Sequence, residues 1–329
     1  MKDTRPAISV LIPVYNVEQY LRRCLDSILS QSFGDIEVLC VNDASPDGSL
    51  AILREYAARD SRVKIIDKPE NEGLMRARYS AYTVATGRYF FFCDSDDYLP
   101  ADALAALYSA AEASAADITV GEMSLINEKG KTVLRPRHGR IGTTHDTYLK
   151  AILNWTTCSL CGSLFKRELF ENAEYTALMN HGFSEDRILL TEILLKKRPT
   201  VFSIDAPTYF YYCNTSSMTR VMLSDEALKE QLKALFLCFH NVEDNSSAHH
   251  SDNLGFIMRY ISLYIEQGYP KETISSFSEE ARQLMDFGLM RRTIGLRLAG
   301  HTWLCTAMPG YRRLMHGIRK AIRKIQGKD

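Results

Sequence analysis

The chain has 329 residues, 46% of them hydrophobic, with 40 basic and 40 acidic side chains and no formal net charge. This length suffices for one large core or for two to three smaller units, so a globular protein is expected. No uninterrupted apolar run approaches the roughly 20 residues that span a bilayer, and the first residues indicate a strand rather than a signal peptide. We therefore expect a cytoplasmic protein without a nucleic-acid partner.

The first 120 residues alternate short apolar runs with segments of helical periodicity. We expect strands at 8–12, 36–41, 63–67, 89–93 and 117–121. We expect helices at 17–31, 48–60, 72–86 and 101–115. Strands that are apolar at nearly every position, separated by helices, indicate a mostly parallel α/β sheet covered on both faces. Such a sheet binds ligands beyond the carboxyl ends of its strands.

After residue 121 this alternation is lost. The pattern predicts a hairpin that turns at 128–131, helices at 145–154 and 184–197, and extended structure at 200–213. Beyond Ser224 the chain is predicted to be helical, with a polar linker at 240–253.

Residues 311–329 carry seven basic residues and an apolar helical face. Two interpretations are open. The segment is either a helix that lies on an anionic membrane surface, on the inner face of the plasma membrane, or a C-terminal helix docked on the body with its basic face in solvent.

The eight cysteines lie mostly among apolar neighbours and are predicted to be small core residues. Cys158 and Cys161 form a CxxC pair. A zinc site would need two more ligands at similar spacing, and the neighbouring sequence has none, so a metal or redox role is the less favoured interpretation.

Polar residues follow each of the first four predicted strands. Tyr15 follows the first strand, Asp43 follows the second, and Arg78 lies on the helix after the third. The fourth strand is followed by DSDD, residues 94–97. Because the carboxyl ends of parallel strands lie along one edge of a sheet, these clusters should meet in one crevice.

The DSDD run places three carboxylates directly after the apolar run YFFFC. Unpaired carboxylates this close repel one another, and a bound cation relieves that repulsion. Carboxylates are suitable ligands for Mn²⁺ or Mg²⁺, whose remaining positions are filled by phosphate oxygens and water. The alternative is a turn in which Asp97 and Pro100 cap the next helix.

Two glycine-rich phosphate-binding patterns are absent. The first turn, IPVYNVEQY, contains no glycine, so it is not the GxGxxG of a dinucleotide fold, and GxxxxGK[ST] does not occur either. A nucleotide would therefore be held by side chains and a metal ion.

Three motifs occur in a specific order: ISVLIPVYNVEQYLRRCLDSILSQ, IEVLCVNDASPDGS and NEGLMRARYSAYTVATGRYFFFCDSDDYL. Together they resemble family 2 glycosyltransferases of the GT-A fold, closely over residues 6–125 and more loosely over 126–220. The resemblance implies a Rossmann-like GT-A domain with a helical C-terminal extension. It also implies transfer of a sugar from a nucleotide-activated donor with inversion at the anomeric carbon.

The resemblance also implies roles for individual residues. The base and ribose pocket would be lined by Pro13, Tyr15 and Glu18, with Tyr15 stacked on the base, and Asp43 would accept a hydrogen bond from a pyrimidine. Arg78 would reach the diphosphate or the base region. Within the DSDD run, Asp94 and Ser95 would contact the donor, Asp96 would bind the metal, and Asp97 would support the sugar or the metal.

Some of these residues have simpler interpretations. Tyr15 could be a packed aromatic residue, Asp43 a cap for the following helix, and Arg78 a surface charge. Glu18 could be an acidic residue that complements the dipole of its own helix.

An inverting transfer needs a general base for the acceptor hydroxyl. The stretch SEDR resembles the acidic pair of the family, so Asp186 is the expected base and Glu185 the residue that orients it. The alternative is an N-terminal helix cap from Ser184 with two acids that complement the helix dipole. Ser217, Thr219 and Arg220 resemble a stretch that closes over donor phosphates, although a plain loop explains them equally well. Processive members of the family that this chain resembles carry a QxxRW signature and transmembrane helices. The sequence has neither, which favours the addition of one sugar per encounter.

We therefore expect three functional regions: a donor-binding half at 1–120, an acceptor-side half at 121–223, and a helical extension at 224–329. The predicted activity is metal-dependent transfer from a UDP-sugar to a saccharide or lipid-linked saccharide in cell-surface polysaccharide synthesis. Two alternatives stay open: a catalytically silent nucleotide-sugar-binding scaffold, and a metal-dependent nucleotidyl- or phosphotransferase.

Overall fold

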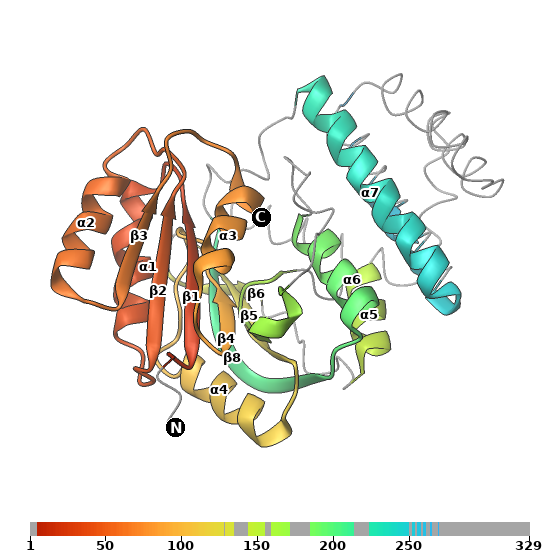
Figure 1. The fold of residues 1–329 in the computed structure, drawn as a ribbon, viewed down its shortest axis with the longest axis horizontal. Helices are drawn as coiled ribbons and strands as arrows, with labels where there is room; N and C mark the ends of the chain where they lie inside the picture. The colour runs from red at the N-terminus through yellow and green to blue at the C-terminus, as the bar shows by residue number, and fades with distance from the viewer. Residues whose placement is uncertain are drawn as a thin grey trace.

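The computed structural model describes residues 5–127, 129–134, 144–154, 159–171, 185–213 and 224–249, and single positions between 252 and 269. In this part of the chain, eight strands form one sheet with seven long helices around it (Figure 1). The strands are β1 (Ile8–Val14), β2 (Ile36–Asn42), β3 (Val63–Asp67), β4 (Tyr89–Phe92), β5 (Ile118–Ile126), β6 (Thr132–Leu134), β7 (Ser163–Lys166) and β8 (Val201–Tyr212). The helices are α1 (Glu18–Leu29), α2 (Ser49–Arg59), α3 (Leu74–Val84), α4 (Ala103–Ser114), α5 (His145–Leu153), α6 (Glu185–Lys197) and α7 (Asp225–Asn245).

The sheet has the order β3-β2-β1-β4-β7-β5-β6, and β8 pairs with β5. Strands β1 to β4 are parallel, as the sequence predicts, because each is separated from the next by a helix. Strand β7 runs antiparallel to both β4 and β5, so the complete sheet is mixed. The predicted α/β GT-A architecture is confirmed, although the four-residue strand β7 was not predicted.

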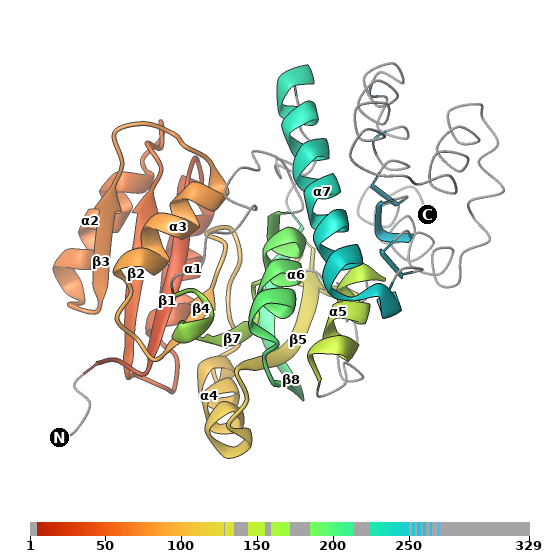
Figure 2. The same cartoon turned by 45° about the vertical axis from the view of Figure 1, so that its right-hand side comes forward.

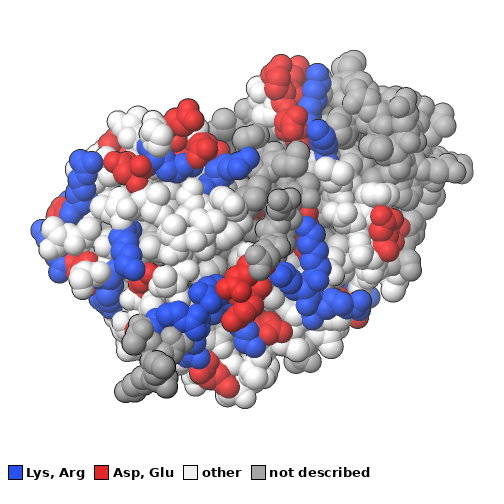
Figure 3. All heavy atoms as spheres, viewed as in Figure 1, with Lys and Arg blue, Asp and Glu red and all other residues white. Residues whose placement is uncertain are grey.

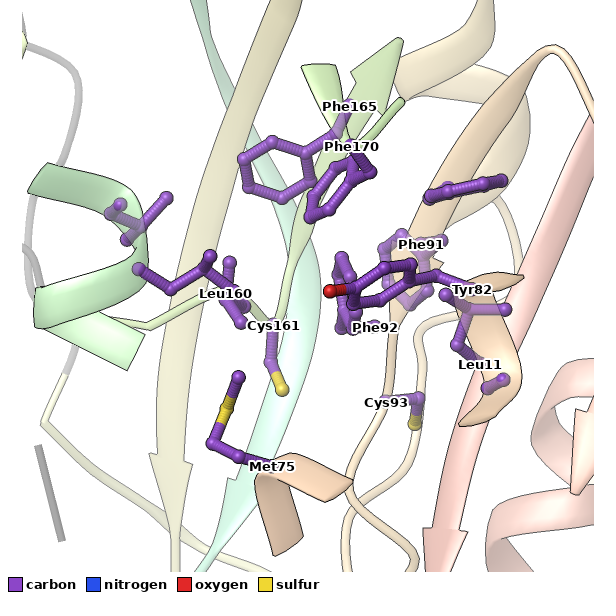
Figure 4. Close-up of a cluster of buried hydrophobic side chains, with 14 of the residues drawn as sticks. Leu11, Met75, Tyr82, Phe91, Phe92, Cys93, Leu160, Cys161, Phe165 and Phe170 are labelled. Atoms are coloured by element: carbon purple, nitrogen blue, oxygen red, sulfur yellow. The ribbon is translucent and has the colours of Figure 1, made fainter. Parts of the chain in front are cut away.

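The core follows from the apolar strands. Every residue of β1, β2 and β4 is buried, including the polar Ser9 and Glu37. Figure 4 shows Phe91 and Phe92 of β4 in one cluster with Phe165 and Phe170, whose rings come from β7 and the turn that follows it. The Phe92 and Phe165 rings lie 5.9 Å apart in an edge-to-face arrangement, which aromatic pairs favour.

The helices pack in two groups. Helix α3 packs on β1 and β2, and α4 packs on β5 and β8, whereas α5 and α7 pack on α6 (Figure 2). Helix α7 continues to Asn245, so the linker predicted at 240–253 was wrong in its first part. The boundary predicted at residue 120 lies inside β5, so one sheet runs through both predicted halves.

The surface carries both signs of charge. On the face shown in Figure 3, basic and acidic side chains lie interspersed, in keeping with the balanced composition. Charge alone therefore does not single out a partner-binding region on the described part of this face. Within the described residues, no helix combines the length and apolarity that a membrane crossing requires.

Candidate active site

The carboxyl ends of β1 to β4 meet at one edge of the sheet, as predicted. Val14 and Asn42, the last residues of β1 and β2, lie opposite each other, and Asn42 lies opposite Asp67 at the end of β3. The Cys93 amide, just past β4, donates to Leu11 of β1 over 3.0 Å. The segments that follow these strands therefore line one edge.

Arg78 is the centre of this edge. Its guanidinium is 1% exposed, so it is not a surface charge. Nη2 donates to Asp94 Oδ1 over 2.8 Å, and Nη1 donates to Asp186 Oδ1 and, over 3.3 Å, to Glu185 Oε1. One cation thus joins the turn after β4 to the first turn of α6, and it brings together four of the predicted site residues.

Asp186 is held by three donors. In addition to Arg78, the hydroxyl of Ser159 donates to Asp186 Oδ2 over 3.1 Å, and the amide of Leu160 donates to the same oxygen over 3.0 Å. The side chain of Asp186 is 15% exposed. Its carboxylate is therefore fixed in direction while it keeps access to solvent.

Glu185 lies in a different environment from Asp186. Burial and the neighbouring Asp186 carboxylate raise the pKa of Glu185 to about 7, against the opposing effect of Arg78. Two adjacent carboxyl groups thus differ in their surroundings, which is the arrangement that separates proton-carrying roles in active sites.

The three acids of the DSDD run have three different environments. The side chain of Asp94 is 29% exposed and contacts Arg78, while Asp96 lies at the rim with intermediate exposure. Asp97 is fully buried: Tyr209 Oη donates to its Oδ2 over 2.7 Å, and the Tyr212 amide donates to its Oδ1 over 2.7 Å. Burial, then Asp96 and Asp94, raise the pKa of Asp97 well above its usual range.

Asp97 is therefore an anchor for β8, and its burial leaves it no direct contact with a ligand at the rim. It does not cap α4, which begins at Ala103 without a side-chain cap. Ser95 is also buried, at 5% exposed. The rim of the DSDD run thus consists of Asp94 and Asp96.

Arg23 supports the backbone at Asp96. Its Nη2 donates to the carbonyl oxygen of Asp96 over 2.8 Å. Its guanidinium lies 4.1 Å from the ring centre of Tyr212 and 4.5 Å from that of Tyr98, within the range of cation–π contacts. The position of Asp96 is consequently set by α1 and by the end of β8.

Asp43 is 2% exposed and binds the segment that precedes α3. Its Oδ1 accepts from the Glu72 amide over 3.1 Å and its Oδ2 from the Gly73 amide over 2.8 Å, while Lys68 Nζ lies 2.9 Å from Oδ1. None of these contacts is a cap for α2. In this state Asp43 holds the loop beside the predicted base pocket.

The remaining predicted pocket residues lie after β1. Pro13 is buried within β1, whereas Tyr15 is 43% exposed and is not a packed core residue. Glu18 opens α1, and its Oε2 accepts from the Gly48 amide over 2.8 Å, beside the first turn of α2. The Tyr15 ring is thus available as a stacking surface, and Glu18 ties the two loops together.

The acidic rim suits a divalent cation that is shared with a ligand. Within the described residues, no group of three or more His, Cys, Asp or Glu side chains could enclose a metal. Mg²⁺ and Mn²⁺ sites of the kind used with phosphates need only one or two carboxylates, because phosphate and water oxygens complete the shell. Asp96, at the rim, fits that requirement.

Several contributors were not predicted. Ser159 and the Leu160 amide lie inside the CxxC segment, and Tyr209 and Tyr212 lie on β8. Cys161 is a buried free thiol. Other predictions fall outside the described residues, namely those on Cys158, Ser184, Ser217, Thr219, Arg220 and 311–329.

Comparison with known proteins gives three findings. The family model described as Glycosyl transferase family 2 matches residues 9–173. Glycosyltransferase GlyA of Streptococcus pneumoniae is 32% identical over 65% of this chain and 32% of its own length. The poly(ribitol-phosphate) beta-glucosyltransferase of Bacillus spizizenii is 30% identical over 71% of this chain and 40% of its own, so this chain spans less than half of either relative.

Among solved structures, S. aureus TarS 1–349 in complex with UDP-GlcNAc has a similar fold. The TM-score is 0.61 at 19% identity, over 79% of this chain and 72% of that chain.

Proposed function

The chain belongs to glycosyl transferase family 2, and from this we propose that it moves a sugar from a uridine diphosphate donor to a hydroxyl of a saccharide or lipid-linked saccharide. The observation that carries the proposal is the Arg78 cluster. It brings an acid from the turn after β4, Asp94, within one guanidinium of the acidic pair at the start of α6. This arrangement supports the proposal that Asp94 binds the donor and that the acidic pair supplies the base at the ligand-binding edge of the sheet.

The donor would lie across the ends of β1, β2 and β4. The exposed ring of Tyr15 offers a stacking surface for the base, and Asp43 is the acceptor beside it. The complex of TarS with UDP-GlcNAc supports a uridine donor, since that protein has the same fold. Asp94 has a second carboxylate oxygen beyond the one that Arg78 binds, and we assign it to the ribose or the sugar.

Asp96 would hold Mn²⁺ or Mg²⁺, and such an ion supplies positive charge to the departing diphosphate. This role fits the rim position of Asp96 and the support of its carbonyl by Arg23. Asp97 and Ser95 are buried, so we assign them to the shape of the turn rather than to donor contact.

Asp186 would take the proton from the acceptor hydroxyl as that oxygen attacks the anomeric carbon. The attack displaces the diphosphate from the opposite side, which inverts the configuration at that carbon. Arg78 holds the Asp186 carboxylate in place, because the two side chains are in direct contact. General-base assistance of this kind contributes about 10²–10⁴-fold.

The proposals about the acceptor and about the biosynthetic role are based on the relatives. The relative from Bacillus spizizenii is named for a glucosyl transfer that involves the polymer poly(ribitol-phosphate). By analogy we propose a role in cell-surface polysaccharide synthesis, with the acceptor side between 121 and 223. Contact of 311–329 with the inner membrane face would suit a lipid-linked acceptor, and loss of these residues should then reduce binding to anionic liposomes.

The test is a panel of UDP-glucose, UDP-N-acetylglucosamine, UDP-galactose and GDP-mannose with Mn²⁺, scored by thermal stabilisation and by release of the nucleoside diphosphate. We expect one UDP-sugar to stabilise the protein and to be hydrolysed slowly. Binding without hydrolysis or transfer would favour the scaffold alternative. Stronger stabilisation by UTP than by UDP would favour a nucleotidyl- or phosphotransferase.

The Asp186→Asn variant tests the base. Turnover should fall by about 10²–10⁴-fold while donor binding stays near that of the wild type, because the amide keeps the shape but cannot take the proton. Turnover close to that of the wild type would remove Asp186 from the mechanism.

A further inference from the structure

The CxxC segment provides the support for the acidic pair. The segment contains two cysteines, but the atoms that reach the site are the Ser159 hydroxyl and the Leu160 amide, both of which donate to Oδ2 of Asp186. We propose that Ser159 is a positioning residue that directs the Asp186 carboxylate toward the acceptor hydroxyl. This inference rests on the proposed function, in which Asp186 is the base.

The first step concerns the direction of the hydroxyl. The oxygen of Ser159 accepts a hydrogen bond from the Cys161 amide over 3.0 Å. Because a lone pair of the serine oxygen is used by the Cys161 amide, the hydroxyl proton of Ser159 points toward Asp186 Oδ2, 3.1 Å from the serine oxygen. Ser159 is therefore a donor to the carboxylate rather than an acceptor from it.

The second step counts the acceptor positions of Asp186. An ionised carboxylate has about four, two on each oxygen. Oδ2 accepts from both Ser159 and Leu160, and Oδ1 accepts from Arg78. The position that is left for a proton from the acceptor is on Oδ1, and Ser159 is one of the groups that prevent the carboxylate from turning away.

The third step concerns the rigidity of the support. Leu160 and Cys161 are 0% and 4% exposed, and Figure 4 shows both side chains within the cluster that includes Phe92 and Met75. The backbone of Cys161 forms an isolated β-bridge with that of Phe92 at the end of β4. Thr208 Oγ1 donates to the carbonyl oxygen of Gly162 over 2.8 Å. A hydrogen-bond donor that is anchored in a packed core holds its partner more precisely than a hydrogen-bond donor on an open loop does.

The charged and titratable groups that face Asp186 come from every neighbouring element. They are Arg78 on α3, Glu185 on its own helix, Asp94 after β4 and Cys161 beside Ser159. Replacement of Ser159 leaves all of them in place. A change in kcat would therefore report the lost hydrogen bond.

The experiment compares Ser159→Ala, Ser159→Thr and the control Ser80→Ala. Ser80 lies on α3, where its hydroxyl donates to the Arg76 carbonyl of its own helix over 2.9 Å. Turnover is measured as UDP release from the fastest UDP-sugar of the panel. For Ser159→Ala we expect kcat to fall about ten- to a hundredfold with the donor KM unchanged.

The split between kcat and KM separates positioning from a structural role. A residue that only supports the fold would change kcat and the donor KM together, whereas loss of a positioning group lowers kcat alone. Ser159→Thr should restore kcat, and Ser80→Ala should match the wild type. If Ser159→Ala has wild-type kcat while Asp186→Asn is inactive, the inference fails and the proposed function stands.

Two further measurements cover the other outcomes. Should Ser159→Ala fail to fold, Ser159→Cys, which keeps a weaker hydrogen-bond donor, is expected to give an intermediate loss of kcat, and a wild-type kcat would overturn the inference. Should the panel show no turnover, the proposed function fails, and crystal structures of the wild type and Ser159→Ala then decide. An unchanged direction of the Asp186 carboxylate without the serine hydroxyl would overturn the positioning role.

Discussion

Nη2 of Arg78 donates to Oδ1 of Asp94 over 2.8 Å, and this contact joins α3 to the turn after β4. The other half of the same guanidinium contacts the acidic pair at the start of α6. The positive charge is buried, so the guanidinium and the carboxylates each need the opposite charge of the other to offset the cost of burial.

Arg78→Ala should therefore destabilise the fold as well as the site. Removal of one partner of a buried ion pair costs about 3–5 kcal/mol, because the other charge is left without compensation. We expect a loss of this size in the free energy of unfolding, measured by urea denaturation. Arg76→Ala is the matched control, since Arg76 lies on the same helix and is exposed, and it should change stability by less than about 0.5 kcal/mol.

Arg78→Lys should not restore the stability and turnover that Arg78→Ala loses. A lysine ammonium is a compact charge, whereas the guanidinium presents separate donors in a fixed plane. One ammonium cannot span Asp94 and Asp186 as Nη2 and Nη1 do. Stability near that of the wild type together with full turnover in Arg78→Lys would contradict this view of the cluster.

Asp96→Ala tests the metal site. UDP at a hundredfold excess over its Kd should stabilise the folded protein by about 2.7 kcal/mol. In the wild type, Mn²⁺ should increase this stabilisation, and EDTA should remove the increase. In the variant, thermal unfolding with UDP should be the same with Mn²⁺ as with EDTA. Asp102→Ala, at an exposed position before α4, is the control and should keep the increase with Mn²⁺. An undiminished Mn²⁺ effect in Asp96→Ala would place the ion elsewhere.

Tyr209→Phe tests the anchor of the DSDD turn. The phenol donates to Asp97 Oδ2 and accepts from the Asp94 amide over 3.0 Å, so it bridges both ends of the turn. Loss of the hydroxyl leaves buried polar groups without their bonds, and we expect about 1–3 kcal/mol lower stability. Tyr20→Phe keeps its ring beside Tyr212 and lies outside the bridge, so equal losses in the two variants would argue against the bridge.

Glu37 should govern stability in acid. It is 3% exposed on β2; burial alone would raise its pKa, but Lys64 and hydrogen bonds from Ser9 and Thr86 lower the pKa to about 2, from 4.5. A lowered pKa gives stability that is present above pH 4.5 and is lost as the pH falls toward 2. The shift corresponds to about 3 kcal/mol.

The check is the free energy of unfolding between pH 6 and 2 for the wild type and Glu37→Gln. The variant should be less stable at pH 6 and should show a flatter decline. Glu70→Gln, at an exposed position, serves as the reference. A decline in Glu37→Gln as steep as that of the wild type would show that other carboxyl groups dominate acid unfolding.

The donor-side half of the fold could be predicted from the sequence because its signals are local. Strands β1 to β4 are apolar along their length, and each is followed by a helix with its own periodicity. The four-residue strand β7 has no such signal. It exists because β4 and β5 present edges to it, and those edges are a property of the folded sheet.

The acids of the site could also be predicted, but not their environments. Asp96 and Asp97 are adjacent and chemically identical, and what separates them is β8, whose Tyr209 is 112 residues from Asp97. The burial of Arg78 likewise depends on an acidic pair 107 and 108 residues away. Ser159 could not be predicted, because its role depends on Asp186, which lies 27 residues away in the sequence.

The bridge from Tyr209 has a consequence for how the protein is made. During translation, Asp94 and Asp97 are added to the chain long before Tyr209, which is 115 positions after Asp94. Domains form from the N-terminus during translation. A nascent chain that has completed β4 therefore has the acidic turn without its hydrogen bonds to Tyr209. The conformation of the acidic turn is therefore fixed late in synthesis, and a chain that ends before β8 would contain strands β1 to β4 but not the tyrosine that braces this turn.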